Sequence, residues 1–483
     1  MKELYLYSAA QVRELDRIAI EDFKISGLTL MRRAADACVK QIIASYPEIG
    51  EVTIFCGSGN NAGDGYIIAG MLAEKGHQVQ VIAIGDPGKL GADARASYDY
   101  CQASAARLES ENFQIQGKLV VDALLGTGLS GAVRENYAHA VALINSSNRP
   151  VLSVDIPSGL CADTGSVLGC AVTADITVTF IGKKRGLFTN DGPDHSGRVV
   201  FCSLDVPEDL YGGRKLKPVM MLTAPAFPKR RRNSHKTTHG HVLVIGGDRG
   251  MGGAVILSGE AALRSGAGMV SVATRHENVT ALLARRPEIM VSGVDNKDQL
   301  QSLLEKATSL VVGPGLGQSD WSRELLNAAL DSGLPVVVDA DGLNILATQG
   351  IKREQWILTP HPGEASTLLA GAGIQEDRFA ATQAIQQKYG GVVLLKGVGT
   401  LVGNGSELSL CPFGNPGMAT AGMGDVLSGV IGALLAQGYG SYEAATYGAT
   451  LHARAGDIAA EHGGQRGLIA TDVISAIRLL VNA

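Results

Sequence analysis

The sequence predicts an α/β protein of two domains, each with a parallel sheet that helices cover on both faces. Three observations lead to this prediction. Short apolar runs alternate with amphipathic segments, and parallel strands need helix-length connections. Glycine-rich loops follow many of these runs. The length of 483 residues allows roughly three domains of about 150 residues, or two large α/β domains.

The first series of elements occupies residues 1–212. Ser8 precedes a helical pattern through Val12, Leu15, Ile18 and Ala19, and a second helix is expected at about residues 30–44. Apolar runs predict strands at 52–56, 79–84, 119–121, 151–154 and 176–181, and a helix is expected at 66–75. In such sheets ligands bind beyond the carboxyl ends of the strands.

Residues 213–240 interrupt this alternation, so we interpret them as a linker. The segment is basic and rich in Pro, without sustained periodicity. Its basic run at 229–232 lacks interleaved aromatic residues, which favours a solvated face over a nucleic-acid site. A second α/β series follows: apolar runs begin at 241, 269, 309, 334, 356 and 392, shorter runs lie at 400–402 and 408–410, and the tail at 425–480 is helical in pattern.

Composition narrows the function to small-molecule chemistry. The formal charge of −5 at pH 7 provides no field to attract nucleic acid or an anionic membrane surface. The chain has no stretch of 18 or more apolar residues, and acidic residues near its start argue against a signal peptide, so we expect a cytoplasmic protein. Seven cysteines without a C-x-x-C pair predict thiols rather than disulfides or zinc. Parallel-sheet domains of this size often assemble, so a homo-oligomer is compatible with the sequence.

The chain contains 62 glycines, many of them clustered in loops. One of these loops is the first candidate site. The segment GSGNNAGDG at 57–65 directly follows the strand at 52–56. Glycines let a ligand approach the backbone, and a helix start offers free N–H groups to an anion. A glycine-rich helix cap is the alternative, but two Asn and an Asp exceed what a cap needs.

Three further strand ends carry polar groups. Asp122 ends one apolar run, the loop 126–131 follows it, and Asp155 ends the next run with Ser158 beyond. A single strand-end Asp is usually an Asx turn or a helix cap. Several at one sheet edge suit a monovalent cation or a general acid/base.

The motifs GSGNNAGDG, VDALLGTGLSG and VDIPSGL resemble those of the NAD(P)H-hydrate epimerase domain, over about residues 1–210. The resemblance implies a Rossmann-like α/β/α sandwich, with Asp155 as the acid/base that also contacts the hydrated nucleotide. It further implies K⁺ at Asn61, Asp122 and Ser158. The implied substrate-binding residues are Asn60, Asn61, Ala62, Gly63, Asp64, Gly126, Thr127, Gly128, Leu129, Ser130, Gly131 and Ala132, where Ala62 replaces the usual Gly.

The second half has its own series of strand-end motifs. They are GGDRGMGGA at 246–254, GPGLG at 313–317, DADG at 339–342, TPHPGE at 359–364, KGVGT at 396–400 and NPGMATAGMGD at 415–425. Backbone N–H groups of 421–424 at a helix start would cradle a phosphoryl group, and Asp425 beside them would accept a proton. The alternative for Asp425 is a first-turn acid that complements the helix dipole, and a lone His361 between prolines is more often structural.

These motifs resemble the NAD(P)H-hydrate dehydratase domain of the ribokinase-like group, over about residues 225–483. The resemblance implies that ADP or ATP phosphorylates the ring hydroxyl with Asp425 as base, that Mg²⁺ neutralises the phosphates, and that phosphate loss restores NAD(P)H. Ala254, Gly317, His361 and Asp425 would contact the hydrate. Lys396, Gly397, Val398, Gly399, Thr400 and Gly424 would hold the nucleotide, and Met423 replaces the common Thr.

Together the halves predict a bifunctional enzyme that repairs hydrated NADH and NADPH. The N-terminal domain would interconvert the R and S hydrates, and the C-terminal domain would dehydrate the S hydrate. A small-alcohol kinase with a regulatory nucleotide-binding N-terminal domain is the main alternative. An N-terminal interaction module without turnover is a second, and an NAD-dependent dehydrogenase is the weakest.

Overall fold

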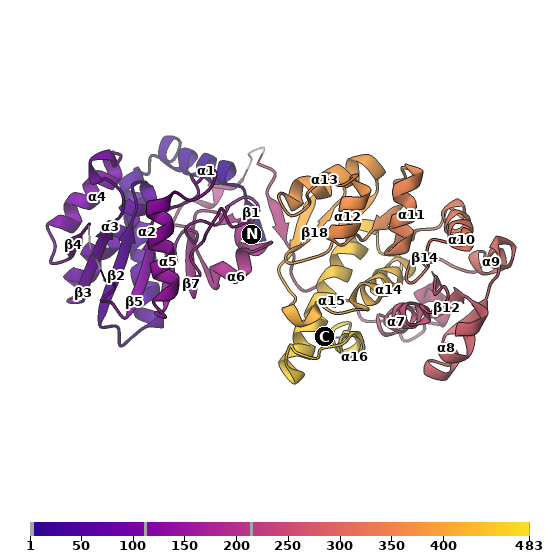
Figure 1. Ribbon diagram of the computed structural model, residues 1–483. Coiled ribbons are helices and arrows are strands. Elements are labelled where there is room, and N and C mark those ends of the chain that lie inside the picture. Colours follow the sequence, from indigo (N-terminus) through magenta and orange to yellow (C-terminus); the bar gives the residue numbers. More distant parts are fainter. Residues whose placement is uncertain (1–3, 111–113, 213–215, 483) are drawn as a thin grey trace. The chain divides into compact units, whose positions relative to one another are not determined.

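The computed structural model describes residues 4–110, 114–212 and 216–482. It divides the chain into two compact units, Met1–Met220 and Met221–Ala483 (Figure 1). The expected linker at 213–240 contains this division, and its residues 213–215 lie outside the described residues. This segment, which shows no sustained periodicity in the sequence, contains a short strand and a 3₁₀ helix (Lys236–His239). Strand β10 (Val219–Met221) lies within it, and Met220 pairs antiparallel with Tyr5 of β1 (Tyr5–Tyr7).

The sheet of the first unit is parallel throughout, as predicted. Its order is β4-β3-β2-β5-β6-β7-β9. The direction of this order reverses between β2 and β5, which makes their carboxyl ends the expected binding edge. The strands are β2 (Glu51–Cys56), β3 (Gln78–Ala83), β4 (Arg107–Glu109), β5 (Leu119–Ala123), β6 (Val151–Val154), β7 (Ile176–Phe180) and β9 (Arg198–Cys202).

Strands β1, β4, β9 and the short β8 (Lys183–Lys184) were not expected from periodicity, because they are short or carry polar and half-exposed residues. The helices of this unit are α1 (Ala9–Glu21), α2 (Gly27–Ser45), α3 (Asn60–Glu74), α4 (Ala92–Gln102), α5 (Glu135–Ser146) and α6 (Gly192–Ser196). Ser8 caps α1 as expected: its side chain accepts a hydrogen bond from the Gln11 amide at 3.2 Å.

Helix α3 corrects the expected loop at 57–65. The helix begins at Asn60 rather than at residue 66, so much of the glycine-rich segment is its first turns. The physical reason is close packing, because a Cβ at Gly63 would lie 2.5 Å from the Met31 sulfur of α2. Glycine here serves the contact between two helices.

The sheet of the second unit repeats the same order of strands. It runs β13-β12-β11-β14-β15-β16-β17-β18-β19, parallel as far as β17 and antiparallel beyond it. Its reversal falls between β11 and β14. The strands are β11 (His241–Ile245), β12 (Met269–Thr274), β13 (Met290–Gly293), β14 (Ser309–Val312), β15 (Val336–Val338), β16 (Trp356–Leu358), β17 (Val392–Leu395), β18 (Thr400–Gly403) and β19 (Leu408–Cys411).

Helices flank this second sheet (Figure 1). They are α7 (Gly252–Arg264), α8 (Val279–Arg285), α9 (Lys297–Leu304), α10 (Asp320–Asp331), α11 (Asp341–Gln349), α12 (Pro362–Leu368), α13 (Arg378–Tyr389), α14 (Met423–Ala436), α15 (Ser441–Gly463) and α16 (Ala470–Leu480). The last three confirm the helical tail. All seven cysteines are free thiols, four of them buried. Among the described residues, no helix has both the length and the apolar character needed to cross a membrane.

Candidate active sites

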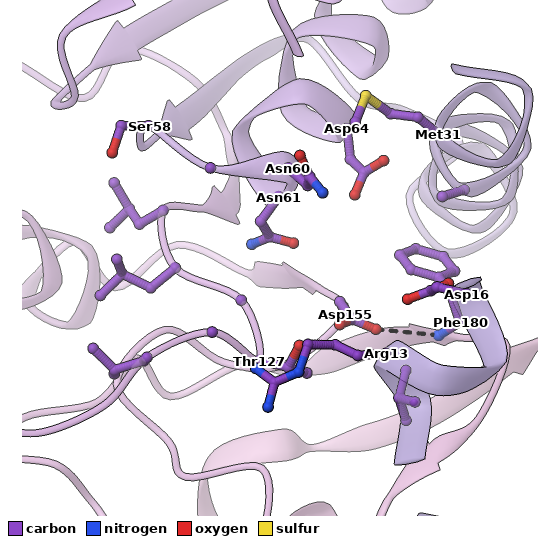
Figure 2. A pocket seen from close by; sticks show the side chains of 18 of the residues that line it. Arg13, Asp16, Met31, Ser58, Asn60, Asn61, Asp64, Thr127, Asp155 and Phe180 are labelled. Atoms are coloured by element: carbon purple, nitrogen blue, oxygen red, sulfur yellow. Dashed lines mark hydrogen bonds between the residues drawn. The ribbon is translucent and has the colours of Figure 1, made fainter. Parts of the chain in front are cut away.

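The first candidate site is a cleft of about 640 Å³ at the carboxyl ends of β2, β5 and β6 (Figure 2). Gly57 lets β2 and β5 approach each other there, since a Cβ at Gly57 would lie 1.9 Å from the Leu124 carbonyl oxygen. The cleft thus lies at the reversal of strand order, where nucleotides bind in such sheets.

Most of the residues expected to bind the hydrate line this cleft. They are Asn60, Asn61, Asp64, Gly126, Thr127, Gly128, Leu129, Ser130, Ala132 and Asp155. Ala62, Gly63 and Gly131 lie outside its lining. The amides of Ala62 and Gly63 both donate to the Gly59 carbonyl, at 3.1 and 3.3 Å, and the Ala62 methyl group is buried in the core.

Asp155 is held by a lysine that the sequence did not reveal. Its backbone adopts the left-handed conformation, with φ of 66°, directly after β6. The Lys184 ammonium donates to Asp155 Oδ1, and the Phe180 amide donates to the same oxygen at 3.3 Å. The Lys184 side chain is 1% exposed. A Lys pair after an apolar run normally reads as solvated, so no signal in the sequence marked Lys184.

Two more carboxylates face the same cleft, from α1 and α3. Burial raises the pKa of Asp16 to about 6, and the Asp155 charge adds to that rise while Lys184 opposes it. Burial, with the charges of Asp155 and Asp16, raises the pKa of Asp64 well above its usual range. Such separation of pKa values within one cleft is typical of acid/base sites.

Asp122 and Ser158 lie beneath the cleft. Both are fully buried, and Asp122 accepts hydrogen bonds from the Ser158 amide at 2.8 Å and the Ser158 hydroxyl at 2.5 Å. Burial raises the pKa of Asp122, and these hydrogen bonds oppose the rise. Within the described ranges no cationic side chain pairs with Asp122, and Asn61 Nδ2 has no hydrogen-bond partner. A buried acid with amide and hydroxyl oxygens nearby fits a hard monovalent cation.

The second candidate site lies at the carboxyl ends of β11, β14, β15 and β17. A Cβ at Gly246 would lie 2.1 Å from the Pro314 carbonyl oxygen, so glycine again permits the approach of two strand ends. Lys396 Nζ lies 2.9 Å from Asp339 Oδ1 and 3.7 Å from Glu364 Oε2. Burial opposes the charge on Lys396, but the two carboxylates raise its pKa overall. The ammonium expected to face phosphate therefore pairs with carboxylates in this structure.

Asp425 lies beside this group, in the first turn of α14. A Cβ at Gly424 would lie 3.2 Å from Lys396 Nζ, which brings the helix start next to the lysine. Burial raises the pKa of Asp425 to about 7, with Asp339 as the next cause. The Met423 side chain is buried in the core, so it supplies no contact at this site.

Arg378 holds the KGVGT loop and was missed by the sequence analysis. Its side chain is buried, and its guanidinium donates to the carbonyls of Val398 and, at 3.1 Å, of Lys396. Gly397 and Gly399 adopt positive φ, 131° and 65°, while Thr400 Oγ1 donates to the Gly397 carbonyl at 3.0 Å. An arginine at a helix start gives no sequence signal for such a role.

The remaining expected residues lie around the same edge. The Gly317 amide donates to Asp341 Oδ2 at 2.9 Å, and Ala254 lies in the first turn of α7. His361 caps α12, because its Nδ1 accepts from the Gly363 amide at 2.9 Å and the Glu364 amide at 3.3 Å. This is the structural role weighed against a catalytic one.

The described residues include no group of three or more His, Cys, Asp or Glu placed to hold a metal ion. Mg²⁺ in phosphoryl-transfer sites usually takes one or two carboxylates and otherwise water and phosphate oxygens. The carboxylates near Lys396 therefore fit an ion that arrives with nucleotide phosphates.

Comparison with known proteins agrees with this division. The family described as YjeF-related protein N-terminus matches residues 27–186, and the family described as NAD(P)H-hydrate dehydratase matches residues 242–479. A ribokinase-like superfamily protein of known structure from Enterococcus faecalis is 31% identical, covers 53% of this chain and 91% of its own, and has a TM-score of 0.50. The chain is thus an enzyme with a Rossmann-like N-terminal unit and a ribokinase-like C-terminal unit.

Two curated relatives match the whole chain. The bifunctional NAD(P)H-hydrate repair enzyme Nnr of Coxiella burnetii is 48% identical and that of Escherichia coli is 40% identical, each over 99% of this chain and over 99% and 94% of the relative. The chain belongs to the family of bifunctional NAD(P)H-hydrate repair enzymes. The predicted combination of epimerase and dehydratase is confirmed, and these matches do not favour the alternative of a regulated small-alcohol kinase.

Proposed function

We propose that each unit carries out one step of the repair at its own strand-order reversal. The N-terminal unit interconverts the R and S hydrates in the cleft around Asp155. The C-terminal unit dehydrates the S hydrate at the edge that carries Asp425. The observation that carries this assignment is that each unit pairs a lysine with a carboxylate at its binding edge, and that one member of each pair is buried, Lys184 in the first unit and Asp339 in the second.

In the epimerase cleft, Asp155 is the acid/base that equilibrates the two epimers at the hydroxyl-bearing ring carbon. Lys184 and the Phe180 amide hold its Oδ1, which leaves Oδ2 to face the substrate. The 126–131 loop and the start of α3 line the cleft beside it and would hold the nucleotide part. Asn61, Asp122 and Ser158 would hold K⁺, whose charge would offset that of buried Asp122.

In the dehydratase site, Asp425 accepts the proton of the ring hydroxyl as that oxygen attacks the terminal phosphorus of ADP or ATP. Phosphate is a far better leaving group than hydroxide, so its loss returns NAD(P)H. The start of α14 offers N–H groups to the transferred phosphoryl group, and the loop that Arg378 holds would bind the nucleotide. Bound Mg²⁺ would neutralise phosphate charge.

Two further expectations belong to this proposal. The chain works in the cytoplasm on small molecules, without nucleic acid or a membrane surface, which its formal charge of −5 and its free thiols favour. Assembly into a homo-oligomer stays a prediction.

Recovery of NADH absorbance from mixed R and S hydrates with ADP or ATP tests the assignment. Asp425→Asn should lower the rate of NADH recovery by roughly 10²–10⁴-fold, because it removes the catalytic base. Asp155→Asn should convert the S hydrate at the parental rate and leave the R hydrate. Asp320→Asn is the matched control, because Asp320 is likewise a first-turn acid, at the start of α10. Parental recovery by Asp425→Asn would contradict the proposal.

A further inference from the structure

The epimerase cleft holds more acid than base. Asp16, Asp64 and Asp155 line it with Lys184 buried among them, while Arg13 and Arg134, which also line it, are exposed. An ammonium has three protons to donate. Lys184 directs its nitrogen to Asp155 Oδ1, to Thr179 Oγ1 at 3.1 Å and to the Phe180 carbonyl at 3.1 Å, so its donors are used.

Asp16 and Asp64 therefore lack the lysine partner that Asp155 has. In the described part of the chain, neither carboxyl group forms a hydrogen bond or an ion pair, although both contribute to the cleft wall. Figure 2 shows both turned toward the space that Asp155 also faces. Burial and the like charges around one buried lysine both favour protonation of the carboxyl groups that have no cationic partner. Asp155 is the one of the three with a cationic partner, so the protons belong on the other two.

Of these two, Asp16 is the one suited to give its proton away and take it back. A catalytic acid works best when its pKa lies near the working pH. Burial raises the pKa of Asp16 to about 6, whereas burial and the charges of Asp155 and Asp16 raise the pKa of Asp64 well above its usual range. Asp16 also comes from α1, a different wall of the cleft from the end of β6 that carries Asp155.

We propose that Asp16 is a second catalytic residue of the epimerase: its carboxyl group donates a proton to the hydroxyl of the bound hydrate while Asp155, paired with Lys184, accepts one from the incoming water. This inference rests on the proposed role of Asp155. The C–O bond breaks with its electron pair on oxygen, the hydroxyl leaves as water, and the ring is left as a cation. Water adds to the other face of that carbon, and its proton passes to Asp155. One water leaves and one enters, and one proton moves from Asp16 to Asp155.

Several charged groups surround Asp16 and set the pH at which it acts. Lys184 on β8 lowers its pKa, and Asp155 raises it. Asp64 on α3 and Tyr211 interact electrostatically with Asp16, and Arg13 lies one turn before it on α1 at the cleft. The acid form is populated below about pH 6, so epimerisation should slow as pH rises above that value.

The test follows one purified epimer of NADH hydrate in the full-length chain without nucleotide, with separation of the epimers by chromatography. Asp16→Asn should lower kcat by about 10²-fold or more, with KM within about threefold, and should lose the descending pH limb. Asp16→Glu should keep that limb at a reduced rate. Asp99→Asn is the control, because Asp99 is an exposed carboxylate of α4 that lies outside the lining of the cleft. Dehydration of the S hydrate should be unchanged in all three variants.

Parental epimerisation by Asp16→Asn, or a descending limb retained in it, would overturn the role of Asp16. If Asp16→Asn does not fold, Asp16→Glu decides: a retained limb supports the role, and a profile without it overturns it. Asp155→Asn separates this result from the proposed function. Loss of epimerisation in Asp155→Asn beside a parental Asp16→Asn rejects Asp16 alone, whereas parental epimerisation by Asp155→Asn rejects the assigned site itself.

Discussion

The two units share one frame, which consists of a strand-order reversal with a glycine, an acid and a lysine at the binding edge. They differ in the carboxyl groups that other elements add to this edge. In each sheet the strand order reverses at a glycine whose Cβ would meet a carbonyl oxygen, at 1.9 Å for Gly57 and 2.1 Å for Gly246. One strand beyond that reversal, at the ends of β6 and β15, lies a non-glycine residue with positive φ, Asp155 at 66° and Ala340 at 47°. A lysine from a later strand end pairs with the acid there, Lys184 with Asp155 and Lys396 with Asp339.

The difference lies in the carboxylates added to this frame. Helix α1 brings Asp16 into the first cleft, while the start of α14 brings Asp425, with its backbone N–H groups, to the second edge. A carboxyl group with no phosphate cradle suits proton transfer to a hydroxyl. A carboxylate beside a helix start suits phosphoryl transfer. The shared frame thus positions an acid and a lysine, and the added element decides the reaction.

The largest expected effect comes from removing either lysine. Lys396→Met leaves buried Asp339 without its cation, which should cost about 3–5 kcal/mol of unfolding free energy. Lys184→Met removes the cation from Asp155, which is 16% exposed, and should cost somewhat less. Urea unfolding of the full chain measures this. Lys40→Met is the matched control, since the Lys40–Asp36 pair is 77% and 47% exposed and its loss should change the unfolding free energy little. A loss as small as the control's in either variant would break the parallel between the units.

A smaller effect is expected at the two glycines. Gly57→Ala and Gly246→Ala force a methyl group against a backbone oxygen, and the strand ends must move apart, at about 1–3 kcal/mol each. Each variant should weaken its own activity, epimerase for Gly57 and dehydratase for Gly246. Gly91→Ala and Gly253→Ala are the controls, because a Cβ at either position meets nothing within 4 Å. Equal stability of all four variants would show that the close approach is not required.

Much of this frame was predictable from the sequence, because apolar runs and strand-end motifs are local patterns. Asp155 and the 126–131 loop were marked by their position after a strand, and Asp425 by its position at a helix start. Lys184, Arg378 and Asp16 were not, since their roles depend on contacts between distant segments. Lys184 lies 29 residues from Asp155, and Arg378 lies 20 residues from Val398. The predicted start of α3 was also wrong, because glycines that permit close packing of two helices give the same sequence pattern as a glycine-rich loop.

The smallest expected effect is also the most direct test of the account, the pH dependence of both activities in one preparation. Asp16, with a pKa of about 6, acts as an acid, so epimerisation should fall as pH rises above that value. Asp425, with a pKa of about 7, acts as a base, so dehydration should rise with pH until about 7 and then level off. Each limb should approach a tenfold change per pH unit. Opposite slopes between about pH 6 and pH 7 are the predicted result, and slopes of the same sign would contradict the account.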